Sequence, residues 1–400
     1  MTAPKGFKAA GVASGIKESG KRDLALIYSE APAKVSATFT MSKLLGAPII
    51  ISKKHLQNGR AQAAVVNSGC ANTCTGEKGL ENAIRMAKIS GDLLGLDPYD
   101  VAVASTGVIG AQLPIDQIEQ GIGKAVQALN VKEHGSAAKA IMTTDSFPKE
   151  KACQIKLGEN LVKIGGMAKG AGMIAPKMAL LGRKEATMLA FITTDANLDG
   201  AFLKQSLEQA VNQSFNRITV DGETSPNDMV ILLANGLAQN KEVVSGGLEA
   251  QAFQEALNFV TGSLARMIVE DAEGATKLIE IKVQGAKSEE DAKKAAFGVA
   301  NSLLVKTAFF GEDPNWGRIM SALGHAGVEF NPQTVDIYFG SEQVVKGGLG
   351  LSLNEEKMRK ILKRRQVQVV INLNLGKAQD TVWTSDLTYD YVKINAEYHT

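Results

Sequence analysis

Short apolar runs alternate along the chain with alanine-rich segments of helical character, and glycine or proline separates most of them. Several runs are apolar at consecutive positions, which is typical of strands covered on both faces of a sheet. They predict strands over Asp23–Ser29, Ala61–Gly69, Asp100–Gly107, Ala186–Ala196, Leu278–Gly285 and Gln366–Gly376. The longer segments predict helices over Leu80–Leu94, Pro114–Leu129, Asp199–Phe215, Leu248–Asp271 and Ser288–Val305. The pattern indicates a mixed α/β protein.

Composition and charge narrow the class of protein further. A chain of 400 residues predicts one large or two medium domains, and the polar stretch Pro176–Ala186 is the place where we expect a boundary. With 44 basic and 42 acidic side chains the net charge is +2, so nucleic acid is not an expected partner. Three cysteines, no signal or transit pattern and no run of about 18 apolar residues predict a cytoplasmic protein without a membrane span.

Familiar catalytic and binding motifs are incomplete in this sequence. Gly15–Arg22 nearly fits a phosphate-binding loop, but Arg22 replaces the magnesium-binding hydroxyl and no strand is predicted before it, so we expect a turn. Cys70 and Cys74 have no second pair of cysteines or histidines, so we expect no metal site. The four histidines are dispersed and no G-x-S-x-G sequence nominates a serine, so a catalytic histidine has little support.

Glycine-flanked hydroxyl residues offer a different chemistry. Thr187 follows the small residue Ala186 at the head of a predicted buried strand. If the bond between them were cut, the new α-amine, with a pKa near 7.7–8.0, would serve as the base for the Thr187 hydroxyl. The alternative is a β-branched residue that simply suits a strand. For Thr106 and Gly107 the alternative is a turn that ends a strand.

Nine ordered motifs, from Gly6 to Thr400, carry a resemblance to a known family. They are GFKAAGVASGIKESGKRDLALI, NSGCANTCTG, VASTGVIG, MTTDSFPK, GGMAKGAGMI, ATMLAFITTDANL, EGATK, DPNWGRI and NAEYHT. Taken together, the chain resembles the glutamate N-acetyltransferase/ornithine acetyltransferase family of arginine biosynthesis. The resemblance implies a layered α/β fold of α+β type, with mixed sheets and covering helices, as in the ornithine acetyltransferase/DmpA-like fold.

The same resemblance implies how the chain matures and what it does. It implies self-cleavage between Ala186 and Thr187 into an α chain, residues 1–186, and a β chain, residues 187–400, assembled as an α2β2 heterotetramer. Thr187 is then the nucleophile that carries an acetyl group from N-acetylornithine to glutamate. Thr106 and Gly107 match the oxyanion-stabilising pair. No cofactor is implied, and acetyl-CoA is a possible second acetyl donor.

Substrate-binding positions also carry over from the resemblance. They fall on Thr143, Lys169, Thr187, Glu273, Asn395 and Thr400, and Thr144 is an alternative to its neighbour Thr143. N-acetylornithine has a carboxylate and an ammonium group, so we infer that Lys169 and Glu273 hold its two ends. Arg318 is interpreted as structural, pairing with a carboxylate.

One departure from the family pattern concerns the cleavage site. Seven extra residues, ALLGRKE, separate Met178 from Ala186. A longer approach to the scissile bond weakens the positioning that drives self-cleavage. The local sequence ATMLAFITTDA is intact, however, and after a cut the extra residues belong to a free chain end, so we expect cleavage to be retained.

Two further functions stay open from the residues alone. An aminopeptidase or amidase of the same fold would use water as the acceptor, and the reaction of its acyl-enzyme would not require glutamate. The other alternative is a non-catalytic metabolite-binding protein, and its support is the glycine loops, including Gly15–Lys21.

Overall fold

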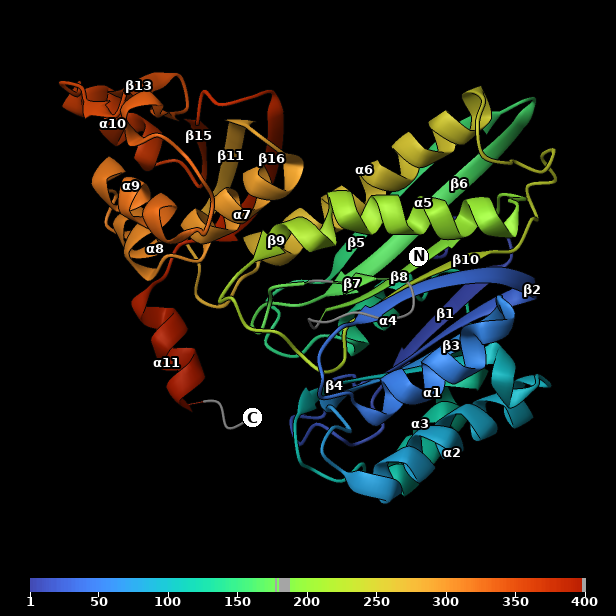
Figure 1. Cartoon of the computed structure of the whole chain (residues 1–400). Helices are drawn as coiled ribbons and strands as arrows, with labels where there is room; N and C mark the ends of the chain where they lie inside the picture. The colour runs from blue at the N-terminus through green and yellow to red at the C-terminus, as the bar shows by residue number, and fades with distance from the viewer. Residues whose placement is uncertain (177, 180–187, 398–400) are drawn as a thin grey trace. The chain divides into compact units, whose positions relative to one another are not determined.

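The structure is a computed structural model that describes residues 1–176, 178–179 and 188–397. These residues form two compact units. Unit 1 consists of Met1–Asn216 and Glu223–Ile268, and unit 2 consists of Arg217–Gly222 and residues 269–397. Each unit has its own sheet and its own clusters of buried apolar side chains (Figure 1).

Unit 1 is built on a mixed sheet. Its main strand order is β4 (Val101–Val108), β3 (Arg60–Cys70), β2 (Leu24–Thr40), β10 (Met229–Ala234), β8 (Leu189–Thr194), β6 (Asn160–Lys169) and β5 (Lys149–Leu157). The short strands β1 (Phe7–Val12) and β7 (Met178–Ala179) also pair with β2. β3 and β4 are parallel, as are β8 and β10, whereas the other described pairs in this sheet are antiparallel.

Both faces of this sheet are buried, because strand residues alternate between them and are apolar at successive positions. On β2, Leu24 and Leu26 belong to one core, which Met86 of α2 and Ile118 of α3 also enter. Ala25 and Ile27, which alternate with these leucines along β2, belong to a second core together with the alanines of α4. The helices of unit 1 are α1 (Ala47–His55), α2 (Gly76–Leu94), α3 (Ile115–Ala128), α4 (His134–Ala140), α5 (Gly200–Gln213) and α6 (Leu248–Glu270).

Unit 2 contains the second mixed sheet. Its strand order is β14 (Leu349–Gly350), β13 (Glu342–Lys346), β12 (Asp336–Phe339), β15 (Gln366–Asn372), β11 (Leu278–Ala286), β16 (Ala378–Ser385) and β9 (Ile218–Thr219). One core joins the sheet to its helices. These helices are α7 (Glu289–Ala300), α8 (Leu303–Phe310), α9 (Trp316–His325) and α10 (Glu355–Leu362), and α11 (Tyr389–Glu397) follows the last strand. The expected α/β fold with layered mixed sheets and covering helices is confirmed.

A strand or helix overlaps every range that the hydrophobic pattern predicted, but several boundaries were wrong, most of all for β2 and for the helix predicted over Ser288–Val305. The strand expected to end at Ser29 continues to Thr40, because the register shift between Tyr28 and Ala33 absorbs Pro32 without ending the strand. The helix predicted over Ser288–Val305 is two helices. The Ser302 side chain accepts the Val305 N–H and starts the second one.

The stretch Pro176–Ala186, expected as a boundary, lies inside the sequence of unit 1. Strand β7 lies within this stretch, strand β8 follows it, and both strands belong to the same sheet. In that sheet β8 and β10, which follow residue 187, lie between β2 and β6, which precede it. Strands from the two sides of the expected cut are therefore interleaved.

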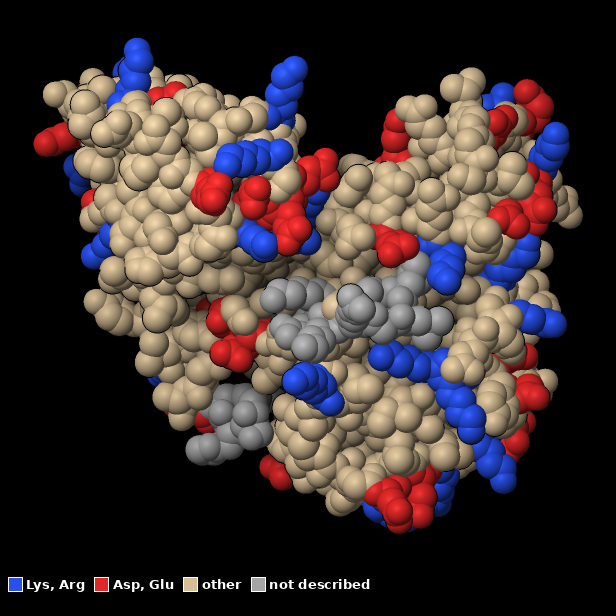
Figure 2. All heavy atoms as spheres, viewed as in Figure 1, with Lys and Arg blue, Asp and Glu red and all other residues tan. Residues whose placement is uncertain are grey.

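Charged side chains of both signs occur side by side over the described surface in view (Figure 2). This mixture agrees with the net charge of +2. Among the described residues, no helix has the length and apolar character that crossing a membrane requires.

Candidate active site

Paired glycines shape the ends of β3 and β4. Gly69 and Gly107 lie opposite each other in this parallel pair and have φ values of +105° and +131°. A Cβ atom on Gly107 would lie 2.4 Å from the carbonyl carbon of Gly69, so no larger residue fits there without moving backbone. The close approach fixes the ends of both strands and places Thr106 and Gly107 together at the end of β4.

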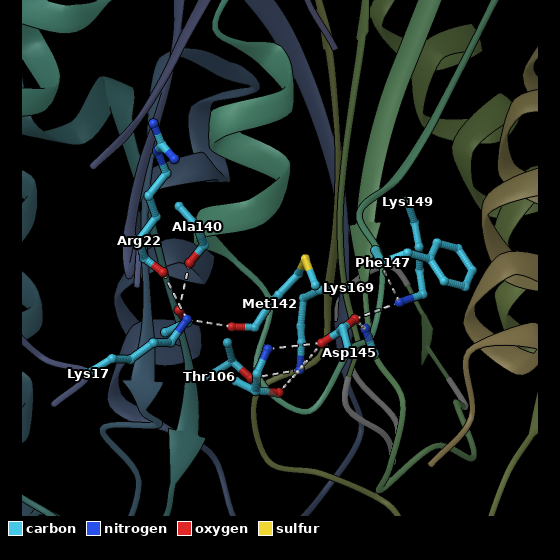
Figure 3. A network of polar contacts seen from close by, with 12 residues as sticks. Lys17, Arg22, Thr106, Ala140, Met142, Asp145, Phe147, Lys149 and Lys169 are labelled. Atoms are coloured by element: carbon cyan, nitrogen blue, oxygen red, sulfur yellow. Dashed lines mark hydrogen bonds and ion pairs between the residues drawn. The ribbon is translucent and has the colours of Figure 1, made fainter. Parts of the chain in front are cut away.

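A buried lysine links the two threonines expected in the site. The Lys169 ammonium group, at the end of β6, donates to the Thr106 hydroxyl at 3.2 Å (Figure 3). It also donates to the Thr143 hydroxyl at 2.9 Å. Lys169 is only 6% exposed. The second contact is made by Thr143, the first of the two adjacent candidate threonines. β4 and β6 are not neighbours in the sheet, so the long Lys169 side chain makes the connection.

Asp145 holds this lysine in place. Its Oδ2 atom accepts the Thr143 N–H at 3.0 Å and lies 3.9 Å from the Lys169 ammonium, while its Oδ1 atom accepts from Gly170 N–H and Lys149. Burial alone would raise the pKa of Asp145. The positive charges of Lys169 and Lys149, with the Gly170 hydrogen bond, outweigh burial and hold the pKa well below its usual range. Asp145 is therefore ionised throughout the neutral range.

A second lysine holds the loop that carries Thr143. The Lys17 ammonium donates to the carbonyl oxygens of Met142 at 2.7 Å and Arg22 at 3.0 Å (Figure 3). Burial lowers the pKa of Lys17 to about 8, and the positive charge of Lys169 adds to this effect. The Met142 end and the Asp145 end of this loop are thus both tied down.

The loop Gly15–Arg22 is confirmed as a turn, but the absence of a preceding strand was wrong, because β1 leads towards it. Its amides are already occupied. The Asp23 carboxylate accepts the backbone N–H groups of Gly15, Ile16 and Lys17 at 2.8–3.1 Å. A phosphate-binding loop offers such amides to a ligand, whereas here an internal carboxylate takes them. The loop therefore gives no support to a nucleotide site.

These groups lie at the end of the sheet where the central strand β8 begins, and this end is called the β8 edge below. Lys169 is paired with Leu189, the first residue of β8, and Leu189 is also paired with Met229 of β10. The Met229 N–H donates to the Met188 carbonyl oxygen at 2.9 Å. The expected nucleophile Thr187 and its neighbour Ala186 lie outside the described residues. In the sequence, Thr187 is two residues before Leu189.

Asp228 is a buried acid at the β8 edge, one residue before β10. Neither of its carboxyl oxygens makes a hydrogen bond of good geometry within the described part of the chain, and the side chain is 0% exposed. Burial raises the pKa of Asp228 well above its usual range, against the opposing influence of the Thr40 hydroxyl and the Lys169 charge. Thr40 itself donates to the Ser225 carbonyl oxygen at 2.7 Å.

Unit 2 brings together two other expected positions. The Asn395 amide, on α11, donates to the Glu273 carboxylate at 2.8 Å. The loop after Glu273 is fixed by Asp386, which accepts the Thr276 and Lys277 N–H groups at 2.9 and 3.0 Å. Thr400, the remaining expected position, lies outside the described residues.

A buried amine supports the same part of unit 2. Lys306, on α8, donates to the Thr384 hydroxyl at 2.9 Å and to the Ser385 carbonyl oxygen, directly before Asp386. Burial lowers the pKa of Lys306 to about 8, against the pull of Asp221 and Asp386. Lys306 thus ties a helix to the loop that orders the Glu273 segment.

Arg318 lies between two helices of unit 2. It donates to the Leu304 carbonyl oxygen at 2.8 Å and to the Thr307 hydroxyl at 3.2 Å. These contacts join α9 to α8, in place of the carboxylate partner that the sequence suggested.

Sequence reasoning passed over several groups of the site. Asp145 and Lys149 stand four residues apart in MTTDSFPK, and this spacing of opposite charges was the signal that pointed to a buried pair. Lys17 lies within the incomplete phosphate-loop motif, and that motif gave no sign of its contact with the Thr143 loop. Asp228 gave no signal of its own, because its burial depends on strands distant in sequence.

The fold and the β8 edge place the chain among layered α/β proteins in which hydroxyls and a buried lysine flank the start of a central strand. The ArgJ family model matches residues 8–400. The chain belongs to the ArgJ family, which makes it an enzyme of the transferase class and confirms the resemblance carried by the nine motifs.

Individual relatives agree with this assignment. The chain is 46% identical to an arginine biosynthesis bifunctional protein ArgJ of Symbiobacterium thermophilum, covering 100% of this chain and 98% of that one. It is 45% identical to a protein of the same name from Geobacter sulfurreducens, covering 99% of each. A crystal structure of the ArgJ protein of Bacillus halodurans is 44% identical with a TM-score of 0.52, and covers 53% of this chain and 100% of that chain.

Proposed function

We propose that the enzyme transfers an acetyl group from N2-acetyl-L-ornithine to L-glutamate through an acetyl ester on Thr187. The observation that carries the proposal is the Lys169 ammonium, which contacts the hydroxyls of both Thr106 and Thr143 beside the first residues of β8. Membership of the ArgJ family supports the same reaction over the hydrolase and binding-protein alternatives.

Self-cleavage between Ala186 and Thr187 is the first step of the proposal. It supplies the free α-amine that Thr187 needs as a base. The solved Bacillus halodurans chain, matched along its whole length, corresponds to 53% of this chain, close to the share that residues 187–400 make up. This agreement supports a mature protein made of two chains.

The first half of the reaction acylates the enzyme. The Thr187 amine accepts the hydroxyl proton while the oxygen attacks the acetyl carbonyl carbon, and the carbonyl π electrons move onto the oxygen. The Thr106 hydroxyl and the Gly107 N–H stabilise that oxyanion, each by about 3 kcal/mol. When the oxyanion collapses, the bond between the acetyl carbon and the ornithine nitrogen breaks, and the amine of Thr187 protonates the leaving nitrogen.

The second half returns the enzyme to its starting state. The neutral α-amine of glutamate attacks the ester carbonyl carbon and gives one proton to the Thr187 amine. The bond between the acetyl carbon and the Thr187 oxygen then breaks, and that oxygen takes the proton back from the Thr187 ammonium. Lys169, Thr143, Glu273, Asn395 and Thr400 are proposed to bind the two amino acids in turn. Acetyl-CoA is proposed as a second acetyl donor, and α2β2 as the assembly.

Intact mass of the denatured protein tests the proposal. The purified enzyme should give two chains, of residues 1–186 and 187–400, and N-acetylornithine should add one acetyl group to the second chain only. Glutamate should then remove the label with release of N-acetylglutamate, whereas discharge by water alone would identify a hydrolase. Thr187→Ala, the control, should remain one chain. An active enzyme that stays one unbroken chain would refute the mechanism.

A further inference from the structure

Two buried lysines share one buried carboxylate beneath the proposed oxyanion site. Asp145 and Lys149 have fully buried side chains and form an ion pair at 2.7 Å. The second oxygen of Asp145 faces Lys169 at 3.9 Å (Figure 3). Since Lys149 already balances the charge of Asp145, the Lys149–Asp145–Lys169 triad keeps one net positive charge. That charge lies at the Thr106 hydroxyl.

The direction of the Thr106 hydroxyl follows from this contact. An ammonium group only donates hydrogen bonds, so Thr106 uses a lone pair towards Lys169 at 3.2 Å. Its own proton must then point elsewhere. A hydroxyl that accepts from a cation is also a stronger donor, because hydrogen bonds in a chain polarise one another. Thr106 is therefore prepared to donate to a developing negative charge.

We propose that Asp145 and Lys149 are positioning residues that hold the Lys169 ammonium on Thr106, so that the Thr106 proton is directed to the oxyanion. This proposal rests on the proposed function and assigns Lys169 a role in the rate of acyl transfer in addition to substrate binding. Burial of Lys169 supports it, since the described contacts of its ammonium are directed to Thr106, Thr143 and Asp145 and not to bulk solvent.

Preorganisation explains why the triad is buried. A solvated lysine would lose rotamer freedom each time it approached Thr106, and water would compete for the hydroxyl. In the observed arrangement, Gly170 N–H and Lys149 fix one oxygen of Asp145, and Thr143 N–H fixes the other. The ammonium is thereby held in position before substrate arrives.

An acetyl donor that has neither carboxylate nor ammonium distinguishes this role from simple substrate binding. We would measure single-turnover acylation of the two-chain enzyme by p-nitrophenyl acetate, from the release of p-nitrophenol. Lys169→Met should slow this acylation about 10- to 100-fold, part of the loss seen when an oxyanion donor is removed. Lys156→Gln is the matched control, because this lysine lies on the surface of β5, and it should acylate at the wild-type rate.

A double-mutant cycle tests whether Lys169 acts through Thr106. In a Thr106→Val background the substitution Lys169→Met should cost less than twofold, because the hydroxyl that Lys169 orients is gone. Asp145→Asn should slow acylation of the otherwise wild-type enzyme in the same direction, and folding of each variant is checked by circular dichroism. A variant that does not cut itself is produced by co-expressing residues 1–186 and 187–400.

The outcomes separate this inference from the proposed function. If Lys169→Met acylates with p-nitrophenyl acetate at the wild-type rate and only raises KM for N-acetylornithine, Lys169 binds substrate alone and the inference is overturned. Additive losses in the cycle overturn it as well. Failure of the wild-type enzyme to form an acetyl ester from N-acetylornithine would instead refute the proposed function.

Discussion

Replacement of Asp145 by asparagine is expected to destabilise unit 1 more than any surface change of the same size. The substitution keeps the shape of the side chain and removes its charge. Lys149, which has no exposed side-chain surface, then keeps a positive charge without its carboxylate partner. Breaking a buried ion pair in this way costs about 3–5 kcal/mol. In a unit of this size, that corresponds to a fall in the unfolding midpoint of roughly 10 °C.

The assay is thermal unfolding of wild-type protein, Asp145→Asn and two reference variants. Lys156→Gln breaks a surface ion pair with Glu159 at 3.1 Å and should change the free energy of unfolding by no more than about 1 kcal/mol. The double variant Asp145→Asn/Lys149→Met also removes the buried positive charge of residue 149 and should recover part of the loss.

The effect of pH on this difference has a definite sign. The folded-state pKa of Asp145 is held below its unfolded value, so the stabilisation is present above pH 4 and is lost as the pH falls through the folded pKa. The gap between wild type and Asp145→Asn should therefore narrow below about pH 4. A midpoint for Asp145→Asn equal to that of Lys156→Gln at neutral pH would show that the buried pair does not stabilise the fold.

Three other changes test particular parts of the structure. Asp23→Asn, which leaves backbone N–H groups of the Gly15–Arg22 loop facing an amide, should cost about 3–5 kcal/mol in urea unfolding and slow acetyl transfer; equal stability would contradict the capping role. Gly107→Ala should lower the free energy of unfolding by roughly 3 kcal/mol or more. The control is Gly95→Ala, whose φ of +69° is strained for alanine but whose Cβ would meet open space, and it should lower the free energy of unfolding by about 1 kcal/mol. Similar losses in the two variants would show that the backbone clash at Gly107 has no effect. The Lys306 amine has a pKa of about 8 when folded and 10.5 when free, so the unfolded chain binds more protons between these values and stability should rise with pH there by up to about 3 kcal/mol. Urea midpoints measured from pH 7 to 10 should rise in the wild-type protein and stay level in Lys306→Met. If the midpoint of Lys306→Met rises as steeply as that of the wild type, Lys306 is excluded as the source.

Periodicity located elements well where one strand or helix carries its own pattern. Leu278–Gly285 and Leu248–Asp271 match β11 and α6 to within one residue at each end. The pattern failed where tertiary contacts decide the outcome. Pro32 reads as a strand end, yet β2 passes it because partners on both sides continue the pairing. Strand β5 was missed because it opens with the charged run Lys149–Lys151, which lowers its hydrophobicity and hides the alternation typical of a strand.

The candidate site shows the same division between motif and context. Thr106, Gly107, Thr143 and Lys169 were reached through motifs, and the described structure brings them to one end of the sheet of unit 1. Their interaction was not readable from the sequence, because a hydrogen bond from Lys169 to Thr106 depends on how β4 and β6 are folded against each other.

The interleaved sheet of unit 1 has a consequence for a matured enzyme. After a cut between Ala186 and Thr187, β8 and β10 of one chain would remain hydrogen-bonded between β2 and β6 of the other. Neither product could leave without tearing the centre of the sheet, so maturation would be a one-way event. Recovery from denaturant would then require two polypeptides to meet again, and its yield would depend on protein concentration. The uncut precursor would refold from a single molecule at any dilution.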